Sequence, residues 1–234
     1  MKKTIKNFQY IFILSTLCYL ASCTAPTKKT YFGQATLRIV NAVPENYNLT
    51  LFVNDTSKTP TPLKFTDFSA HQNVMAGTST IYTKSNGNVI NRSDLTFLFL
   101  PKENYTIFIA GKISKDSLSY ISFKDSLNAP IQGQAKVRLI NTSYNSASLD
   151  AIFSNRSIDS LNTFGNIGFR SGNNYLQFKP GVYFIKLRQT GSKNIIFTKS
   201  NIEIKAGKIY TLWAKGLING NANYSLDVGV LNDN

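Results

Sequence analysis

One strand-like stretch occurs twice in this chain and decides its fold. It reads GQATLRIVN at residues 33–41 and returns as GQAKVRLIN at residues 133–141. Gly, Gln, Ala, Arg and Asn keep their places, and the other apolar positions exchange one aliphatic side chain for another. A strand that recurs after 100 residues, about the length of a domain, predicts one folding unit used twice.

The pattern inside this stretch is that of a β-strand. Ala35, Leu37 and Ile39 alternate with Thr36 and Arg38, and a period of two is typical of a strand with one buried face. Residues 56–72 are rich in Thr, Pro and Ser, and we interpret them as a long connection with a short strand near 63–65. Further strands are expected at 48–53, 78–83, 95–100, 105–111, 120–123, 148–153, 180–187, 195–197, 202–204, 210–216 and 224–230. No stretch has a sustained helical period, so the sequence predicts an all-β protein of two tandem β-sandwich domains.

The repeat also predicts the boundaries of these domains. The first β-sandwich repeat is expected at residues 33–127 and the second at residues 133–234. Asn128, Pro130 and Gly133 mark the linker, which we place at Asp125 to Gly133.

The first 22 residues have the features of an export signal. Lys2, Lys3 and Lys6 precede an apolar run at residues 11–20, and no acidic residue occurs before it. This run is too short to cross a bilayer, which takes roughly 20 residues, but it fits the apolar core of a signal peptide.

A lipid attachment site follows at once. Leu20-Ala21-Ser22-Cys23 resembles the lipobox of bacterial lipoproteins, in which Leu and two small residues precede a Cys. In that family the Cys receives a diacylglyceryl group, with palmitate-type chains, and cleavage just before it removes the leader. The resemblance implies a signal peptide at 1–22 and a lipid anchor on Cys23, and the alternative is an ordinary signal peptide with a coincidental Cys.

The next residues predict a tether and a location. Residues 23–32 are polar and contain Pro26, as in a short lipidated tether. In Bacteroidetes-type lipoproteins, a run of acidic residues just after the Cys resembles a signal for export to the cell surface. This chain has no such run, because its first charged residues after Cys23 are Lys28 and Lys29. This difference favours the periplasmic face of the outer membrane over the cell surface.

Charge and cysteine content exclude several classes of function. Removing the three leader lysines from a net charge of +14 leaves +11. A positive charge of this size is typical of proteins that bind nucleic acid, anionic membranes or acidic glycans, but it is also found where lysines are merely scattered over the surface. No basic run forms a nucleic-acid tract, so we expect no nucleic-acid partner. After cleavage Cys23 is the only Cys and is acylated, which excludes a disulfide, a thiolate nucleophile and a cysteine metal site.

The first repeat resembles a known envelope family. Ala35 to Pro44 has the pattern Ala-x-aliphatic-Arg-aliphatic-aliphatic-Asn-Ala-x-Pro, which is similar to the start of the domain of unknown function 4397. The likeness continues through Leu49–Asn54, Ala76-Gly77 and Tyr105–Gly111. That family is typical of bacterial envelope lipoproteins, often as tandem copies, so the resemblance implies immunoglobulin- or transthyretin-like sandwiches and no catalytic residues. The second copy departs from the pattern at Thr142 and Tyr144.

Candidate catalytic residues are few. His71 is the single histidine, and a Ser-His-Asp triad would need it with Asp67 or Asp94 as the orienting acid. No nucleophile-elbow pattern surrounds a Ser, so we expect a loop histidine at a strand entry. Metal sites of His and Cys are excluded by count, the carboxylates lack calcium-loop spacing, and we expect no cofactor. Two carboxylates distant in sequence could still converge as in a glycosidase.

Arg38, Arg138 and Trp213 each have two interpretations. The equivalent arginines would be a pair of anion sites, or outward strand residues that pair with a carboxylate or lie over an aromatic ring. Trp213 would be a sugar-stacking platform or, as is more usual within a strong strand, part of the core.

Three short motifs are candidates for modification. Ser117, Ser126 and Ser160 each lie in an Asp-Ser-Leu sequence, which resembles the O-glycosylation acceptor of Bacteroidetes envelopes. The alternative is ordinary turn chemistry, which Asp and Ser both favour.

Three functions therefore stay open. The leading hypothesis is a non-enzymatic cell-envelope lipoprotein that is attached to the membrane by its lipid and binds or scaffolds another envelope component. The second is a carbohydrate-binding module, which an exposed aromatic row would favour, and the third is a glycoside-acting enzyme, which clustered buried carboxylates would favour. A large apolar patch would instead favour a protein partner.

Overall fold

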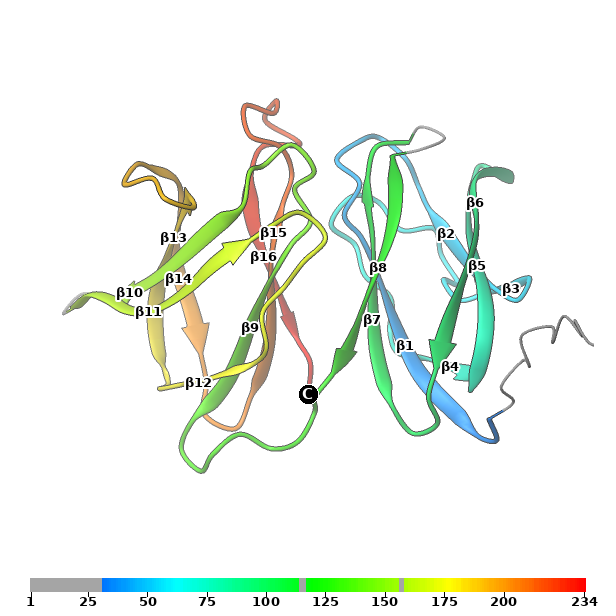
Figure 1. Ribbon diagram of the computed structural model, residues 1–234, viewed down its shortest axis with the longest axis horizontal. Helices are drawn as coiled ribbons and strands as arrows, with labels where there is room; N and C mark the ends of the chain where they lie inside the picture. Colours follow the sequence, from blue (N-terminus) through cyan, green and yellow to red (C-terminus); the bar gives the residue numbers. More distant parts are fainter. Residues whose placement is uncertain (1–30, 114–116, 156–157) are drawn as a thin grey trace, which may run out of the picture. The chain divides into compact units, whose positions relative to one another are not determined.

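The computed structural model describes residues 31–113, 117–155 and 158–234 (Figure 1). The predicted signal peptide at 1–22, Cys23 and most of the predicted tether lie outside these ranges. The described chain is all-β and of the β-sandwich type, as the sequence predicts. Its described ranges contain no helix long and apolar enough to cross a membrane.

The first half of the chain forms two four-stranded sheets. One sheet has the order β4-β1-β7-β8 and the other the order β3-β2-β5-β6. β1 runs parallel to β7 and antiparallel to β4. The strands are β1 (Gln34–Asn41), β2 (Thr50–Val53), β3 (Thr56–Ser57), β4 (Gln72–Met75), β5 (Gly77–Ser85), β6 (Asn88–Phe99), β7 (Asn104–Gly111) and β8 (Leu118–Asp125).

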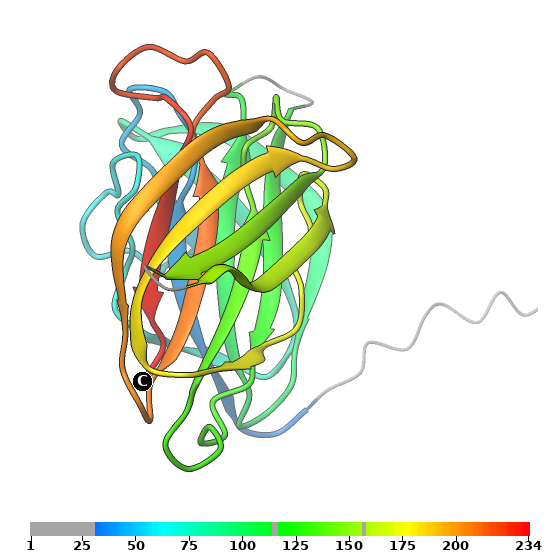
Figure 2. The same cartoon turned by 90° about the vertical axis from the view of Figure 1, so that its left-hand side faces the viewer.

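The second half repeats this topology strand for strand. Its sheets have the orders β12-β9-β15-β16 and β11-β10-β13-β14, and β9 runs parallel to β15. In Figure 2 the strands of the β11-β10-β13-β14 sheet cross in front of those of the β12-β9-β15-β16 sheet. The strands are β9 (Ala135–Asn141), β10 (Leu149–Asn155), β11 (Ile158–Ile167), β12 (Leu176–Phe178), β13 (Gly181–Gln189), β14 (Ile195–Ile204), β15 (Ile209–Lys215) and β16 (Asp227–Asn232).

Each half has its own apolar core between its two sheets. Leu37, Ile39 and Ile107 belong to the first core, and Leu139 and Leu212 belong to the second. These are the inward positions of the alternating strands, so the period of two does decide which side chains fill each sandwich.

Equivalent glycines end equivalent strands. Gly111 closes β7 and Gly216 follows β15, and their φ angles of 100° and 78° are ones that L side chains rarely adopt. A Cβ on either would lie 2.1 Å from a backbone oxygen, of Ser117 or Ser225 respectively. Both positions therefore require glycine for the same reason.

Several predicted elements differ from the structure. The short strand expected near 63–65 is only an isolated bridge between Leu63 and Leu49, because the Pro- and Thr-rich connection allows no longer pairing. The two strands expected at 195–197 and 202–204 are one continuous strand, β14, and β16 begins at Asp227 rather than Tyr224. β3, β4, β11 and β12 were not predicted, since they are short or polar and depend on neighbouring strands for their hydrogen bonds.

A third apolar cluster joins the two halves. It contains Val40 and Phe108 from the sheet of β1 and β7, and Ile140, Trp213 and Leu231 from the sheet of β9, β15 and β16. These side chains point away from the sandwich cores, so β1 and β9 are buried on both faces. The described chain from Tyr31 onward accordingly forms one compact unit.

A candidate binding groove beside a duplicated ion pair

Arg38 and Arg138 form reciprocal buried ion pairs across the two halves. Arg38 of β1 pairs with Asp233, which follows β16, and Arg138 of β9 pairs with Asp125, the last residue of β8. Each arginine side chain is only 3% exposed. Each half thus contributes one arginine and one aspartate, and each arginine pairs with the aspartate of the other half.

The hydrogen bonds around these pairs repeat as well. Thr106 donates to Asp125 at 2.8 Å, and its counterpart Thr211 donates to Asp233 at 2.6 Å. The Nη1 of each arginine donates to the carbonyl just before the other half's aspartate, at 3.1 Å in both cases. Such bonds are what make a buried ion pair tolerable, because each charge is compensated on several sides.

The network contains two buried carboxylates, those of Asp125 and Asp233. Asp125 and Asp233 are buried and close to one another through Thr106 and Arg38. Both carboxylates, however, accept hydrogen bonds from an arginine and a threonine. They are therefore occupied in joining the two halves and are not placed to exchange protons with a substrate.

A loop beside each arginine also repeats, although its sequence does not. Thr66 and Arg170 have positive φ angles of 77° and 70°, and each donates its N–H to the carbonyl of the Asn that ends β1 or β9. Two residues later, Phe68 and Gly172 form matching bridges with β1 and β9. Residues 66–71 and 170–175 therefore have the same conformation beside equivalent strands.

A groove of about 570 Å³ lies beside Arg138. Its walls come from β8 and the residues after it, from β9, and from the repeated loop before β12. The lining residues are Ser122, Phe123, Lys124, Ser126, Lys136, Arg138, Gly172, Asn173, Asn174 and Tyr175. It is the candidate binding site, because it combines charged, polar and aromatic groups in one hollow.

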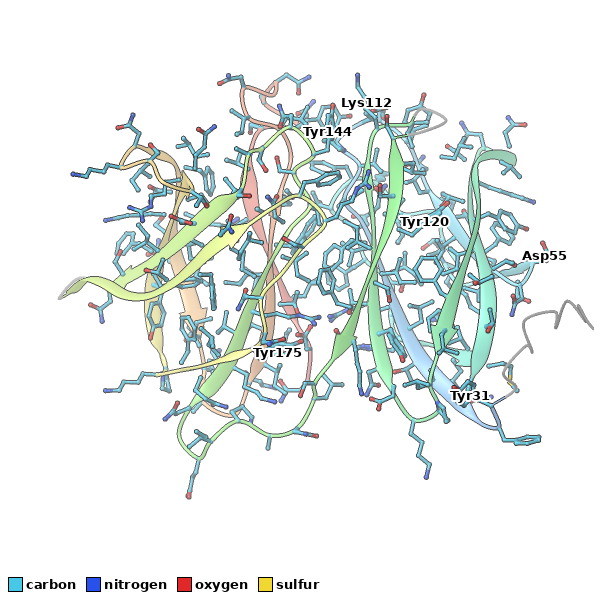
Figure 3. All side chains as sticks on the ribbon, viewed as in Figure 1. Tyr31, Asp55, Lys112, Tyr120, Tyr144 and Tyr175 are labelled. Carbon is cyan, nitrogen blue, oxygen red and sulfur yellow. The ribbon has the colours of Figure 1, made fainter. Side chains whose placement is uncertain are left out.

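Tyr175 connects the groove to the ion pairs. It lies just before β12, beside β9 (Figure 3). Its hydroxyl donates to Asp233 at 2.9 Å, and its ring lies 4.5 Å from the guanidinium carbon of Arg138. Burial raises the pKa of Tyr175 well above its usual value, although the positive charge of Arg138 acts in the opposite direction.

Three cations face the groove, and their charges are balanced differently. Arg138 pairs with Asp125, and Lys124 pairs with Glu103 at 2.7 Å. The hydrogen bond with Glu103 raises the pKa of Lys124. Lys136 instead donates to the carbonyls of Ser126 and Asn128, at 3.1 and 2.6 Å, and burial lowers its pKa.

Comparison with known proteins places the sequence in a family. Residues 35–152, just over half of the chain, match the domain of unknown function DUF4397. The chain belongs to the DUF4397 family. No curated protein matches it. A crystal structure from Bacteroides eggerthii, described as a "putative cell adhesion protein", covers 89% of this chain and 97% of its own, with 11% identity and a TM-score of 0.24.

The predicted site residues of this DUF4397 protein lie as follows. Trp213 is 2% exposed and packs between the halves, which confirms the core interpretation over the sugar platform. Arg38 and Arg138 pair with carboxylates and Arg138 lies over aromatic rings, as the second interpretation states. Both side chains point outward from their own sandwich core, as that interpretation states, but they are buried because the opposite half of the chain covers them.

His71 directly precedes β4, as expected of a histidine at a strand entry. Burial lowers the pKa of His71, the charge of Arg38 lowers it further, and Asp125 and Asp233 act in the opposite direction. Asp67 does not serve it as an orienting acid, but accepts a hydrogen bond from the backbone of Lys64 at 3.0 Å. Within the described ranges no group of His, Cys, Asp and Glu is arranged to hold a metal ion.

The candidate modification sites of the DUF4397 protein differ in their surroundings. Ser126 is exposed, but Asp125 before it is buried in the ion pair. Ser117 lies in a turn before β8, and Ser160 lies in β11. Sequence reasoning missed Lys136, Gly172 and Tyr175 as groove residues, and the signal available was the change from Thr36 to Lys136 between the two repeats.

Proposed function

We propose that this DUF4397 protein is a non-enzymatic lipoprotein of the cell envelope that binds or scaffolds another envelope component. The observation that carries the proposal is the reciprocal pairing of Arg38 with Asp233 and of Arg138 with Asp125. In these pairs the buried carboxylates of Asp233 and Asp125 hold the two sandwiches together. A rigid pair of sandwiches suits the presentation of a binding surface.

The proposal includes a second family copy in the second half of the chain. The family match ends at residue 152, within β10. The equal strand order, the repeated ion pairs and the repeated loop support extending the family to residues 133–234. The two copies would then be tandem domains at 33–127 and 133–234.

The proposal also includes a lipid anchor on Cys23. A single acyl chain binds a membrane only marginally, whereas two or more chains give stable anchoring. A diacylglyceryl group on Cys23 supplies two chains, and the absence of an acidic run after it supports the periplasmic face of the outer membrane. Cys23→Ser is expected to leave the fold intact and to abolish lipidation. Recovery of the wild-type protein in the soluble fraction without lipid would refute the anchor.

A carbohydrate-binding module is the alternative, and the groove with Tyr175 and Phe123 favours it. The proposed function is tested with residues 24–234 as bait in envelope extracts, beside a glycan array. An unrelated soluble protein of equal positive charge is the matched control, and washing at high salt removes weak charge-driven binding. Retention of the same envelope component by both baits, or by neither, would contradict a specific binding role.

A further inference from the structure

We propose that the groove beside Arg138 binds the carboxylate of an acidic sugar, such as a uronic acid. The inference rests on the proposed binding function and adds the class of ligand. It is carried by the difference between two equivalent places in a duplicated framework.

Because the two halves have the same strand pairing, each groove residue can be compared with its counterpart in the other half. Strand pairing aligns Lys136 with Thr36 and Lys124 with Asn232, and the repeated loop aligns Gly172 with Phe68. Beside Arg38 the equivalent surface therefore carries an exposed phenyl ring, 54% accessible, and neither lysine. Beside Arg138, Gly172 takes the place of that phenyl ring, and the ammonium groups of Lys124 and Lys136 are both present.

Gly172 is what allows the loop to lie against the first half of the chain. A Cβ at this position would lie 2.9 Å from the side chain of Ile140, 3.0 Å from the carbonyl of Leu139 and 3.1 Å from the ring of Phe123. With no side chain there, the ring of Phe123 forms one wall of the groove and Tyr175 another.

Lys136 supplies the charge that recognises an anion. Of the three cations that line the groove, Arg138 and Lys124 have carboxylate partners in the described part of the chain. Lys136 is 8% exposed, and its ammonium group lines the groove and donates two protons to neutral carbonyl groups. No carboxylate in the described part of the chain neutralises its charge, and an ammonium group has a third proton to donate. A carboxylate forms a strong, charge-assisted hydrogen bond with such an ammonium group.

The rest of the lining favours a sugar over an acidic peptide. Ser122, Ser126 and Asn174 are exposed, and their hydroxyl and amide groups match the hydroxyls of a sugar ring. The partly exposed rings of Phe123 and Tyr175 offer flat apolar surface to the ring's C–H groups. A hollow of about 570 Å³ is within the size range of small-ligand sites.

Calorimetric titration of residues 24–234 tests this inference, with glucuronate and galacturonate as probes and glucose and galactose as their neutral counterparts. We expect a uronate to bind at least about tenfold more tightly than its neutral counterpart. Inorganic phosphate and a tetrapeptide of Asp and Glu are the competing anions. Equal or tighter binding of either would overturn the assignment to a sugar.

Lys136→Thr installs the residue found at the equivalent place in the first half and should weaken uronate binding by about tenfold or more. Lys193→Thr removes the same charge from an exposed turn and is the matched control, expected to leave binding unchanged. Equal effects of the two substitutions would overturn the proposal.

Amide chemical shifts of the unmodified protein locate the ligand without any variant, in case Lys136→Thr fails to fold. Shifts on adding glucuronate should concentrate at residues 122–126 and 172–175. No binding, or shifts elsewhere, would refute the groove. If the envelope pull-down succeeds while these titrations fail, only the class of ligand is wrong.

Discussion

Phe108 and Trp213 occupy the same position in β7 and β15, and their rings meet with centroids 5.6 Å apart. A residue that touches its own counterpart marks the axis of an isologous contact, in which each side offers the same patch. The reciprocal ion pairs of Arg38 and Arg138 follow the same two-fold rule. The two halves of one chain thus associate as two copies of a protein would in a symmetric dimer.

The first prediction concerns the ion pairs. Arg38→Met should lower the free energy of unfolding by about 3–5 kcal/mol, because it leaves the buried carboxylate of Asp233 without its cation. Adding Asp233→Leu should restore much of the loss, since no unpaired charge then remains. Urea unfolding measures both variants.

The exposed pair of Lys205 and Glu203 provides the control for this prediction. Lys205→Met should change the free energy of unfolding by less than about 1 kcal/mol. An equally small effect of Arg38→Met would show that the buried pair does not hold the halves together.

The second prediction concerns the size of the central rings. Trp213 is larger than Phe108, and Gly229 stands on the strand beside Trp213 where Ile121 stands beside Phe108. A Cβ on Gly229 would lie 2.2 Å from the indole nitrogen. Gly229→Ala should therefore destabilise the protein by about 1–3 kcal/mol, and much less when Trp213→Phe is already present.

A double-mutant cycle by thermal or urea unfolding measures this coupling. Gly168→Ala is the control, because a Cβ there meets only ordinary contacts at 3.5 Å or more. Additive effects of Gly229→Ala and Trp213→Phe would contradict the fit between the ring and the glycine.

The third prediction concerns pH. Burial by itself would raise the pKa of Asp150, but hydrogen bonds from Asn166 and Thr190 and the contact with Arg188 lower it below its usual 3.8 on balance. A carboxyl whose pKa is lower in the folded state stabilises the fold above pH 3.8, and this contribution disappears as the pH falls through the folded pKa.

Asp150→Asn should thus be less stable than the wild type at pH 7, and the gap should narrow below pH 3.8. Urea midpoints measured between pH 7 and pH 2.5 follow the gap. Asp55→Asn, which removes a carboxylate from an exposed turn, is measured beside it as the control. A gap that stays constant with pH would refute the stated role of the carboxylate.

The fourth prediction concerns the linker. Limited proteolysis should cut within residues 126–133, where Asn128, Ala129 and Ile131 are exposed, and should yield two protected fragments. Because the contact between the halves is buried, the fragments should migrate separately on a denaturing gel but elute together under native conditions. Cuts spread evenly along the chain would contradict the two-domain plan, and immediate separation of the fragments would contradict the strength of the contact.

The sequence by itself determined the long strands that repeat between the two halves. Alternation in residues 33–41 and 133–141 predicted β1 and β9, and the likeness of 105–111 to 210–216 predicted β7 and β15. These elements follow from local patterns, since a period of two states which side chains face a core. The conformation shared by residues 66–71 and 170–175 had no such pattern, because backbone hydrogen bonds to β1 and β9 impose it on unlike residues.

Only the tertiary structure decided what lies on the outer face of these strands. Arg38 sits at a polar position of the alternation, and the pattern alone is the same whether that position faces water or a second sheet. Its partner Asp233 is 195 residues away, and the two meet only because the sheets of the two halves pack together. The groove has the same origin, because Lys136 and Gly172 become a site only where the first half supplies Phe123 and Lys124 as the opposite wall.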